Sequence, residues 1–212
     1  MAPMGQVREG KKQQTRQRIS DVATELFFAR GFEAVTVDEI ALAAQVSKMT
    51  VFNYFARKED LILDRDDDLK LLPFRQALAA RSSSQSPTDA IRAVVREMHS
   101  RKEPLCHINA LMVGWWRVVN ASPALKARMR ELADEAAEGL ASELAGPKPD
   151  GLARMAAAMI VMTLRVAREE AVHQVEKGVS AKKANALFLE LMAQGLTAVE
   201  ALLSNASRTA AP

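Results

Sequence analysis

The sequence is poor in cysteine, glycine and aromatic residues. Its 212 residues include 1 Cys, 9 Gly and 5% aromatic side chains. A lone cysteine, Cys106, cannot form an internal disulfide, which suits a reducing compartment. Few aromatic and glycine residues, combined with many Ala, Leu and Met residues, favour helices over sheets. The composition therefore predicts an all-α protein.

Long apolar runs are also missing. No uninterrupted apolar segment reaches the roughly 18 residues of a membrane span, and the polar, basic N-terminus is unlike a signal peptide. We therefore expect no membrane segment and a cytoplasmic location. The sequence also lacks a Gly-rich phosphate loop and a paired-carboxylate pocket, so no cofactor and no catalytic residue are predicted.

Positive charge is concentrated near the N-terminus. The chain carries a net charge of +3 with a pI of about 9.1. Five of its cations come early and are opposed there only by one glutamate; they are Arg8, Lys11, Lys12, Arg16 and Arg18. Such a segment could reach DNA phosphates, although a solvated, frayed terminus is the commoner fate of these residues.

Helical periodicity and breakers divide the chain into about nine helices. They are expected near residues 15–30, 37–44, 48–55, 58–73, 87–102, 105–120, 123–145, 150–177 and 181–204. The breakers include Gly31, Pro73 and the stretch 146–149. The predicted organisation is a flexible basic arm (1–10), a three-helix segment (11–57), a longer helical core (58–204) and a flexible tail (205–212).

Two short helices with separate start signals follow the first helix. Thr36 and Glu39 have the spacing of a capping box, and Ser47 is suited to cap the next helix. A turn of about three residues, 45–47, joins the two helices. This is the pattern of a helix-turn-helix, whose second helix enters the DNA major groove. On spacing alone, an ordinary helical corner is an equal alternative.

Residues from about 15 to 63 resemble the TetR family of transcriptional regulators. The motifs are Phe-x-x-x-Gly-Phe at 27–32, Thr36-Val37, Ile40-Ala41, Ala44, Val46-Ser47, Phe52-Asn53-Tyr54-Phe55 and Lys58-Glu59-Asp60-Leu61. The resemblance implies an all-helical chain with a helix-turn-helix DNA-binding domain at 11–57 and a ligand-binding and dimerisation domain at 58–204. It also implies a homodimer. Two positions depart from the family pattern: Gln45 stands where Gly is frequent, and Phe52 stands where a Tyr hydroxyl often binds phosphate.

A helical wheel of the second short helix separates its core face from its reading face. With Val51 toward the core and 100° per residue, Met49 and Asn53 point away, while Thr50 and Phe52 lie on the flanks. Asn can pair with adenine, and Met or Thr can contact a thymine methyl. The predicted reading residues are therefore Met49, Thr50 and Asn53. The resemblance further implies that four residues contact phosphate: Thr36, Lys48, Tyr54 and Lys58.

The C-terminal helices contain more apolar residues than one core stripe requires. Candidate effector-binding residues are His99, His107, Met112, Trp115, Trp116, Met159, Met162, Thr163 and Val166. For each of these, core packing is the alternative. The predicted effector is a small lipophilic molecule, acyl-bearing or aromatic.

Apolar stripes on the last two helices, about 150–204, predict a homodimer through a four-helix bundle; packing within one subunit is the alternative. Such a dimer would present two recognition helices to a palindromic double-stranded DNA operator. The predicted function is a ligand-responsive repressor that its effector releases from DNA.

Two alternatives belong to other functional classes. The first is a helical small-molecule-binding protein with no DNA role, which leaves the basic segment and the Asn53 face unexplained. The second is a metal-dependent enzyme that uses His99, Cys106 and His107.

Overall fold

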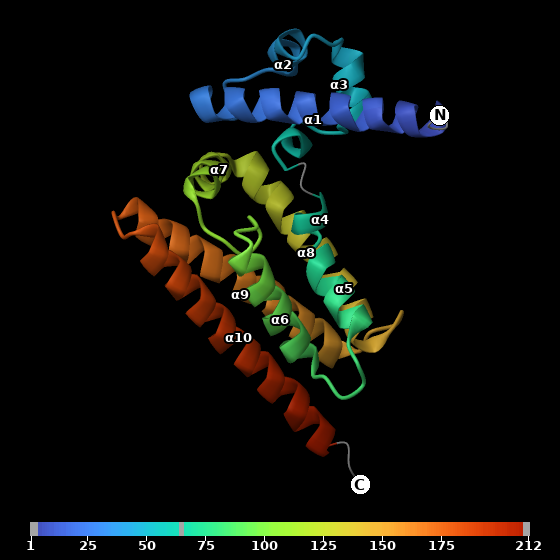
Figure 1. Ribbon diagram of the computed structural model, residues 1–212, viewed down its shortest axis with the longest axis vertical. Coiled ribbons are helices and arrows are strands. Elements are labelled where there is room, and N and C mark those ends of the chain that lie inside the picture. The colour runs from blue at the N-terminus through green and yellow to red at the C-terminus, as the bar shows by residue number, and fades with distance from the viewer. Residues whose placement is uncertain (1–3, 64–65, 210–212) are drawn as a thin grey trace. The chain divides into compact units, whose positions relative to one another are not determined.

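The computed structural model describes residues 4–63 and 66–209, and it is helical throughout this part of the chain (Figure 1). The helices are α1 (Met4–Arg30), α2 (Val37–Ala43), α3 (Lys48–Tyr54), the 3-10 helix η1 (Glu59–Leu61), α4 (Asp66–Leu69), α5 (Leu72–Ala80), α6 (Pro87–Ser100), α7 (Ala110–Ala121), α8 (Pro123–Ala145), α9 (Gly151–Glu176) and α10 (Ala181–Thr209). The predicted all-α class is confirmed.

Helix α1 begins earlier than the sequence indicated. It starts at Met4, whereas the prediction placed residues 1–10 in a flexible arm and began the helix near Thr15. Lys, Arg and Gln are good helix formers, and extending a nucleated helix costs little. Gly10 in the middle of this extension costs only about 1 kcal/mol, which does not stop the helix. Residues 1–3 lie outside the described part.

The predicted fourth helix is divided into η1, α4 and α5. Leu71, which precedes α5, has a left-handed φ of 52°, so the helical path is broken there. Pro73 was expected to end or kink a helix, but it lies in the first turn of α5. Its missing N–H has no intrahelical partner at that position, so proline fits a helix start. Residues 64 and 65, part of the predicted acidic run, are not among those described.

Helix α7 also begins later than predicted, at Ala110 instead of Leu105. The Asn109 side chain accepts a hydrogen bond from Met112 N at 2.9 Å and so caps the helix. Ser122 caps α8 just before Pro123, accepting from Leu125 N at 3.2 Å, and Asp150 caps α9, accepting from Ala153 N at 2.8 Å. Helix α10 continues to Thr209, into the predicted tail.

The chain forms two compact units. The first contains residues up to 65 together with 117–128, and the second contains residues 66–116 and the chain from 129 onward. Helix α7 therefore starts in the second unit and ends in the first. Helix α8 starts in the first unit and ends in the second. Within the first unit, α2 and α3 lie along the same side of α1 (Figure 1). In the second unit, the long helices α9 and α10 run side by side.

Each unit has its own apolar core. Fully buried residues of the first include Ile19, Phe27, Ile40, Val51, Phe55 and Leu61. Those of the second include Phe74, Leu78, Ile91, Leu105, Phe188 and Val199. Small residues let α9 and α10 approach closely, because a Cβ added at Gly195 would lie 2.9 Å from the Cβ of Thr163.

Helix α10 is unusually apolar for a helix with so little of its surface buried. Residues 181–205 are long and apolar enough to cross a membrane by composition, and 22% of the window is buried. The sequence-based expectation considered only uninterrupted apolar runs and missed this segment. The core helix of a soluble protein passes the same test, so the finding alone is weak evidence for a membrane. Several leucines of α10, including Leu187, Leu191 and Leu202, are half-buried.

Candidate nucleic-acid interface

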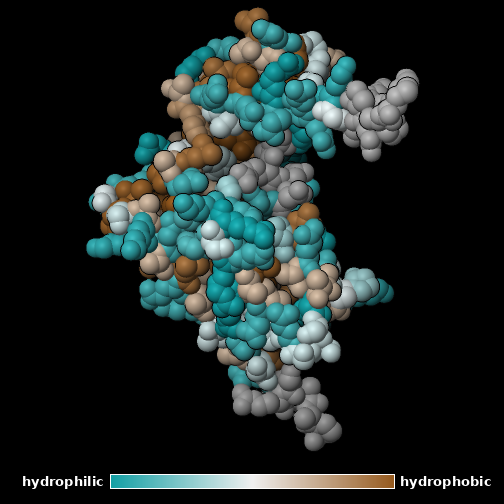
Figure 2. Space-filling model, in the orientation of Figure 1, coloured by the Kyte–Doolittle hydropathy of each residue, from teal (hydrophilic) through white to brown (hydrophobic). Residues whose placement is uncertain are grey.

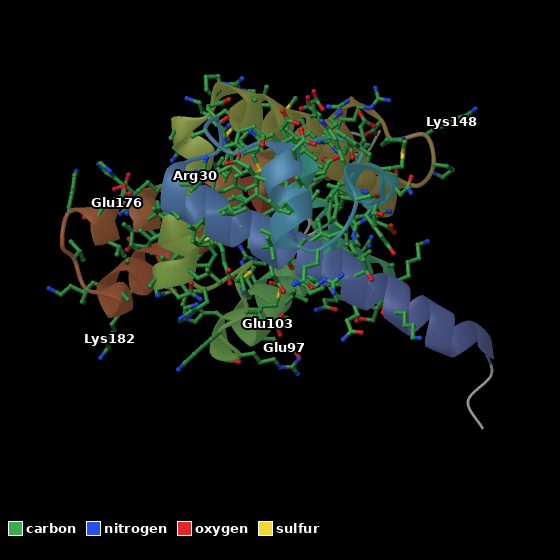
Figure 3. All side chains as sticks on the ribbon, turned by 90° about the horizontal axis from the view of Figure 1, so that it is seen from above. Arg30, Glu97, Glu103, Lys148, Glu176 and Lys182 are labelled. Atoms are coloured by element: carbon green, nitrogen blue, oxygen red, sulfur yellow. The ribbon has the colours of Figure 1, made fainter. Side chains whose placement is uncertain are left out.

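The start of α2 is fixed by a capping box, as predicted. Thr36 Oγ1 accepts from Glu39 N at 3.2 Å, and the Glu39 carboxylate accepts from Thr36 N at 2.8 Å. Arg30, at the end of α1 (Figure 3), donates to the other Glu39 oxygen at 2.7 Å. The Thr36 backbone bond, with help from Arg30, lowers the Glu39 pKa to about 2. Glu39 thus ties α2 to α1 as a stable carboxylate.

The turn between the two short helices contains a residue with left-handed backbone, at the position where the sequence has Gln45 and the family often has glycine. Gln45 adopts a left-handed φ of 54°. Its N–H bonds Leu42 O at 3.1 Å, and Val46 N bonds Ala41 O at 2.9 Å, which closes the end of α2. Left-handed backbone costs a residue with a Cβ about 1–2 kcal/mol. The departure from the family's glycine is therefore a point of local strain.

Helix α3 is held from behind by α1. Ser47 caps it, accepting from Thr50 N at 3.0 Å, and Val51 is buried as the wheel required. The Arg16 guanidinium donates to Tyr54 O at 2.6 Å and lies over the Phe55 ring, 4.5 Å from its centroid. Arg16 was read only as part of a basic segment, and in the structure it anchors the end of α3.

The opposite face of α3 is open. Met49 is 70% and Phe52 45% exposed, and Asn53 is exposed too. Thr50 is half-buried, and its hydroxyl lies 2.8 Å from Ser47 Oγ. The hydropathy surface shows hydrophobic atoms beside hydrophilic ones over this unit (Figure 2). An exposed apolar side chain next to a carboxamide is the combination that contacts base edges and thymine methyls in a major groove.

The residues predicted to contact phosphate differ in how far contacts within the protein already engage their side chains. Lys48 is exposed, and its distance of 2.9 Å to Asp38 is that of a surface ion pair. Lys58 is engaged inside the unit, where its ammonium donates to Phe32 O at 2.6 Å and lies 4.2 Å from the centre of the Phe32 ring. The Thr36 hydroxyl lies 2.9 Å from Glu39 Oε2, so its single proton is committed. Tyr54 is half-buried.

One exposed residue near the reading face escaped the sequence analysis. Leu42, on α2, is 81% exposed, the largest value among the large hydrophobic residues described. The sequence analysis used its neighbours Ile40 and Ala41 but assigned nothing to Leu42 itself. Counting 100° per residue from buried Ile40 would have turned it 200° away from the core.

In the second unit, His99 and His107 lie together, as their spacing permitted. Their ring centroids are 5.1 Å apart, and His99 Nδ1 is 2.9 Å from Cys106 O. Burial, then the neighbouring His99 and Lys102, lower the His107 pKa. Burial raises the pKa of the Cys106 thiol to about 12, so it is a poor nucleophile and a poor metal ligand at neutral pH. Among the side chains described, no group of three or more His, Cys, Asp or Glu could hold a metal ion.

The apolar effector candidates separate into two sets. Met112 and Trp116 are buried, with Trp115 half-buried against Trp116 at a ring distance of 5.3 Å. Met162 and Val166 are 49% and 45% exposed, and they lie on the outer surface of α9. Met159 is half-buried, and so is Thr163, which packs against Gly195 of α10. The α7 residues therefore lie in the interior of the second unit. The α9 residues lie on its surface or in the contact between α9 and α10.

Comparison with known proteins agrees with this geometry. Residues 19–64 match the family model described as bacterial regulatory proteins, tetR family. The transcriptional regulator TcmR of Streptomyces glaucescens is 31% identical over 61% of this chain and 58% of its own. The putative mycofactocin biosynthesis regulator MftR of Mycobacterium tuberculosis is 34% identical over 55% of this chain and 57% of its own. The chain thus spans a little over half the length of these relatives.

Solved structures show the same fold. A TetR-family regulator from Mesorhizobium loti has a TM-score of 0.54 at 17% identity, over 91% of this chain and 96% of that one. SmeT in complex with triclosan has a TM-score of 0.55 at 21% identity, over 84% of this chain and 90% of that one. Residues 19–64, which contain the helix-turn-helix, therefore match the tetR family of bacterial regulatory proteins, and the fold of the chain is similar to that of solved regulators of this kind.

Proposed function

We propose that the protein is a ligand-responsive transcriptional regulator that acts in the cytoplasm, most simply as a repressor. One observation carries the DNA-binding part. Helix α3 is fixed on its inner side by Val51 and Arg16, while Met49 and Asn53 project from its outer side. A rigid helix that presents a carboxamide and a thioether to solvent is suited to read bases in a major groove. The regulators TcmR and MftR support the same conclusion.

In this proposal, Asn53 reads an A·T pair in each half-site through the edge of adenine. Met49 and Thr50 contact neighbouring thymine methyls, and Lys48 and Tyr54 position the helix on phosphates. The residues assigned to phosphates set the affinity for DNA of any sequence, and those assigned to bases set which DNA sequence is preferred. This division makes the two groups separable by experiment.

The test is binding-site selection on the full-length protein and on Asn53→Ala. We expect Asn53→Ala to lose about 1–3 kcal/mol of discrimination at one A·T pair in each half-site. Lys48→Ala is the matched control, because it should weaken binding to all sequences alike. If the selected motif is identical for Asn53→Ala and the parent, the assignment of Asn53 is wrong. If no DNA is selected at all, the protein is a helical ligand-binding protein without a DNA role.

We further propose a homodimer through α9 and α10. Met155, Met162 and Val166 lie one to two helical turns apart on α9 and are 45–55% exposed. Helix α10 adds the half-buried leucines Leu187, Leu191 and Leu202. Together these faces could form a four-helix bundle about a two-fold axis, with the recognition helices about 34–36 Å apart on a palindromic operator. Light scattering should give a dimer, and Met162→Glu with Val166→Glu should yield a monomer.

The effector is proposed to act through α7 and α8, because both helices run from the second unit into the first. Within the first unit, buried Ser122 donates to Glu33 at 2.6 Å, and Arg128 Nε donates to Asp60 at 3.1 Å. A ligand that displaces α7 beside Met112 and Trp116 would move these contacts. It shifts DNA affinity only by as much as it prefers one of the two arrangements.

A further inference from the structure

The N-terminal turns of α1 carry positive charge that the protein itself hardly balances. Five cations and one acid stand in the first 20 residues of the chain, and the first turn of α1 contains no acidic side chain. Lys11 and Lys12 are both exposed, and neither has an ion-pair partner among the side chains described. Lys12 also lies four residues before Arg16, and like charges at this spacing on a helix repel each other. An anion from outside the protein would relieve this repulsion.

Lys12 lies on the side of α1 that carries α3. Counting 100° per residue, Lys12 points within about 20° of Ile19 and Ala23, which are fully buried. Arg16, on the same side one turn later, donates to Tyr54 O at 2.6 Å and so touches the end of α3. Lys12 is nevertheless exposed, and α1 continues past α3 toward its N-terminus (Figure 1). The core-facing side of α1 therefore extends beyond the core and carries an exposed cation there.

Lys11 offers an internal comparison. It has the same charge and is exposed too, but it points about 80° away from Ile19 and about 120° away from Ala23. Arg18 is exposed on the same side as Lys11, because seven residues make almost two full turns. The charge near the N-terminus is thus divided between the side of α1 that carries α3 and a side that does not.

The proposed DNA interface needs cations, and contacts within the protein already engage two of its candidates. Lys58 donates to Phe32 O at 2.6 Å, and Lys48 pairs with Asp38 at 2.9 Å. Double-stranded DNA carries one negative charge per about 1.7 Å of its axis, and the lysines and arginines that neutralise phosphates supply most of the affinity that is independent of sequence. Lys12 offers a charge that no contact among the described residues engages.

The shape of the major groove brings its phosphates to the level of α1. The groove is about 8.5 Å deep, so the phosphates at its edges stand well above the base edges that α3 would read. Packed helix axes are about 8–10 Å apart, which sets α1 back from α3 by a similar distance. A lysine on the α3 side of α1, beyond the end of α3, is therefore placed to meet the phosphates at the edge of the groove and not the bases.

We propose that Lys12 contacts a phosphate at the edge of the groove that α3 occupies, and that the helical N-terminal turns of α1 hold it there. This inference rests on the proposed DNA-binding function and adds a contact from α1, outside the helix-turn-helix helices α2 and α3. The contact positions the protein without reading sequence, because it involves the backbone of the DNA.

Lys12→Gln against Lys11→Gln is the matched test, because each change removes one exposed charge and glutamine has a helix propensity close to that of lysine. The probes are two fluorescein-labelled duplexes, one of random sequence and one that the parent protein selects, titrated with the full-length protein at about 0.05–0.2 M salt. For Lys12→Gln we expect the slope of log K against log salt to become less steep by about one on both duplexes. The affinity should fall about two- to fivefold. Lys11→Gln should keep the slope of the parent, and Lys12→Arg should restore it.

Gln13→Pro tests whether the helix holds Lys12 in place. Proline is tolerated in the first turn of a helix, so α1 would begin at residue 13 and the turn that carries Lys12 would be released, while every charge remains. We expect this variant to lose the contribution of Lys12 to the slope, while circular dichroism and thermal unfolding show that the rest of the chain is folded. If the variant does not fold, Lys12→Gln and Lys11→Gln decide the question.

An unchanged slope in Lys12→Gln, or an equal loss in Lys11→Gln, would overturn the proposal. A folded Gln13→Pro protein with the slope of the parent would also overturn it, because a flexible arm would then serve as well as a helix. A parent protein that binds neither duplex refutes the proposed DNA-binding function together with this inference. A parent that binds both duplexes without any contribution from Lys12 refutes the inference alone.

Discussion

The two units of this protein are stabilised differently. In the helix-turn-helix unit, named polar contacts fix nearly every junction: the Thr36 and Glu39 box, the Ser47 cap, Arg16 on Tyr54 and Lys58 on Phe32. In the second unit the long helices pack mainly through apolar and small residues, and buried donors such as Trp116 Nε1 lack partners within the described chain.

This contrast matches what each unit is proposed to do. A reading helix must hold its side chains to a fraction of an ångström, and directional hydrogen bonds provide that geometry. An effector core must accept a molecule and adjust, and methionine-rich packing with unsatisfied donors permits this. The following experiments are arranged from the largest expected effect to the smallest.

The sharpest test of the packing-dominated unit is Gly195→Ala. The added methyl group would collide with the Thr163 side chain, including its Cβ at 2.9 Å, so α9 and α10 must separate. We expect a loss of about 1–3 kcal/mol of unfolding free energy in denaturant titrations. Thr163→Ala in the same chain should recover part of it, because the two clashing γ atoms are removed.

Gly151→Ala is the matched control for that experiment. Nothing lies within 4 Å of the position of its added Cβ, so the substitution should change stability by less than about 0.5 kcal/mol. Equal effects at the two glycines would mean that the close approach of α9 to α10 contributes nothing particular to stability.

The polar contacts of the first unit are tested by comparing Lys58→Met with Lys48→Met. Lys58 loses a 2.6 Å bond to Phe32 O and a ring contact, so we expect a loss of about 1–2 kcal/mol in unfolding free energy. Lys48 loses only an exposed pair with Asp38, so stability should be almost unchanged.

In DNA binding we expect the larger effect from Lys48→Met and the smaller one from Lys58→Met. Lys48→Met should reduce the salt dependence of binding by about one unit, as expected for a lost phosphate contact. Lys58→Met should leave the salt dependence largely intact at temperatures where it is folded. A reduced slope for Lys58→Met would restore the phosphate contact that the family resemblance implied.

Gln45→Gly tests the strain in the turn. Glycine accepts the left-handed φ of 54° without penalty, and its greater freedom in the unfolded chain offsets part of the gain. We expect a net stabilisation of about 0.5–1 kcal/mol by thermal or chemical unfolding. Gln45→Ala keeps the Cβ and is the control; it should bring no such gain.

The smallest effect concerns the pH dependence contributed by Glu39. Its folded pKa of about 2 lies below the ordinary value of 4.5. The stability that it contributes is therefore fully present above about pH 4.5 and is lost as the pH falls through about 2. Acid titrations of the parent and Glu39→Gln should diverge above pH 4.5 and converge toward pH 2. A constant difference across this range would contradict the assigned cause.

Local chemistry made much of the first unit predictable. The capping box, the Ser47 cap, the buried Val51, the open Met49 and Asn53 and the suspect Gln45 follow from neighbours within a few residues. The early start of α1 escaped because helix propagation past Gly10 depends on small energies. The internal role of Lys58 escaped because its partner is 26 residues away.

The sequence by itself determined the all-helical class, most helix starts and the exposed face of α3, because caps and 3.6-residue periodicity act locally. In the second unit, only the tertiary structure decided which apolar residues face inward. It separated buried Trp116 and Met112 from exposed Met162 and Val166, and it brought Arg168 to Met112 across 56 residues of chain. Burial is a property of three-dimensional neighbours, so composition and spacing could nominate these side chains but could not place them.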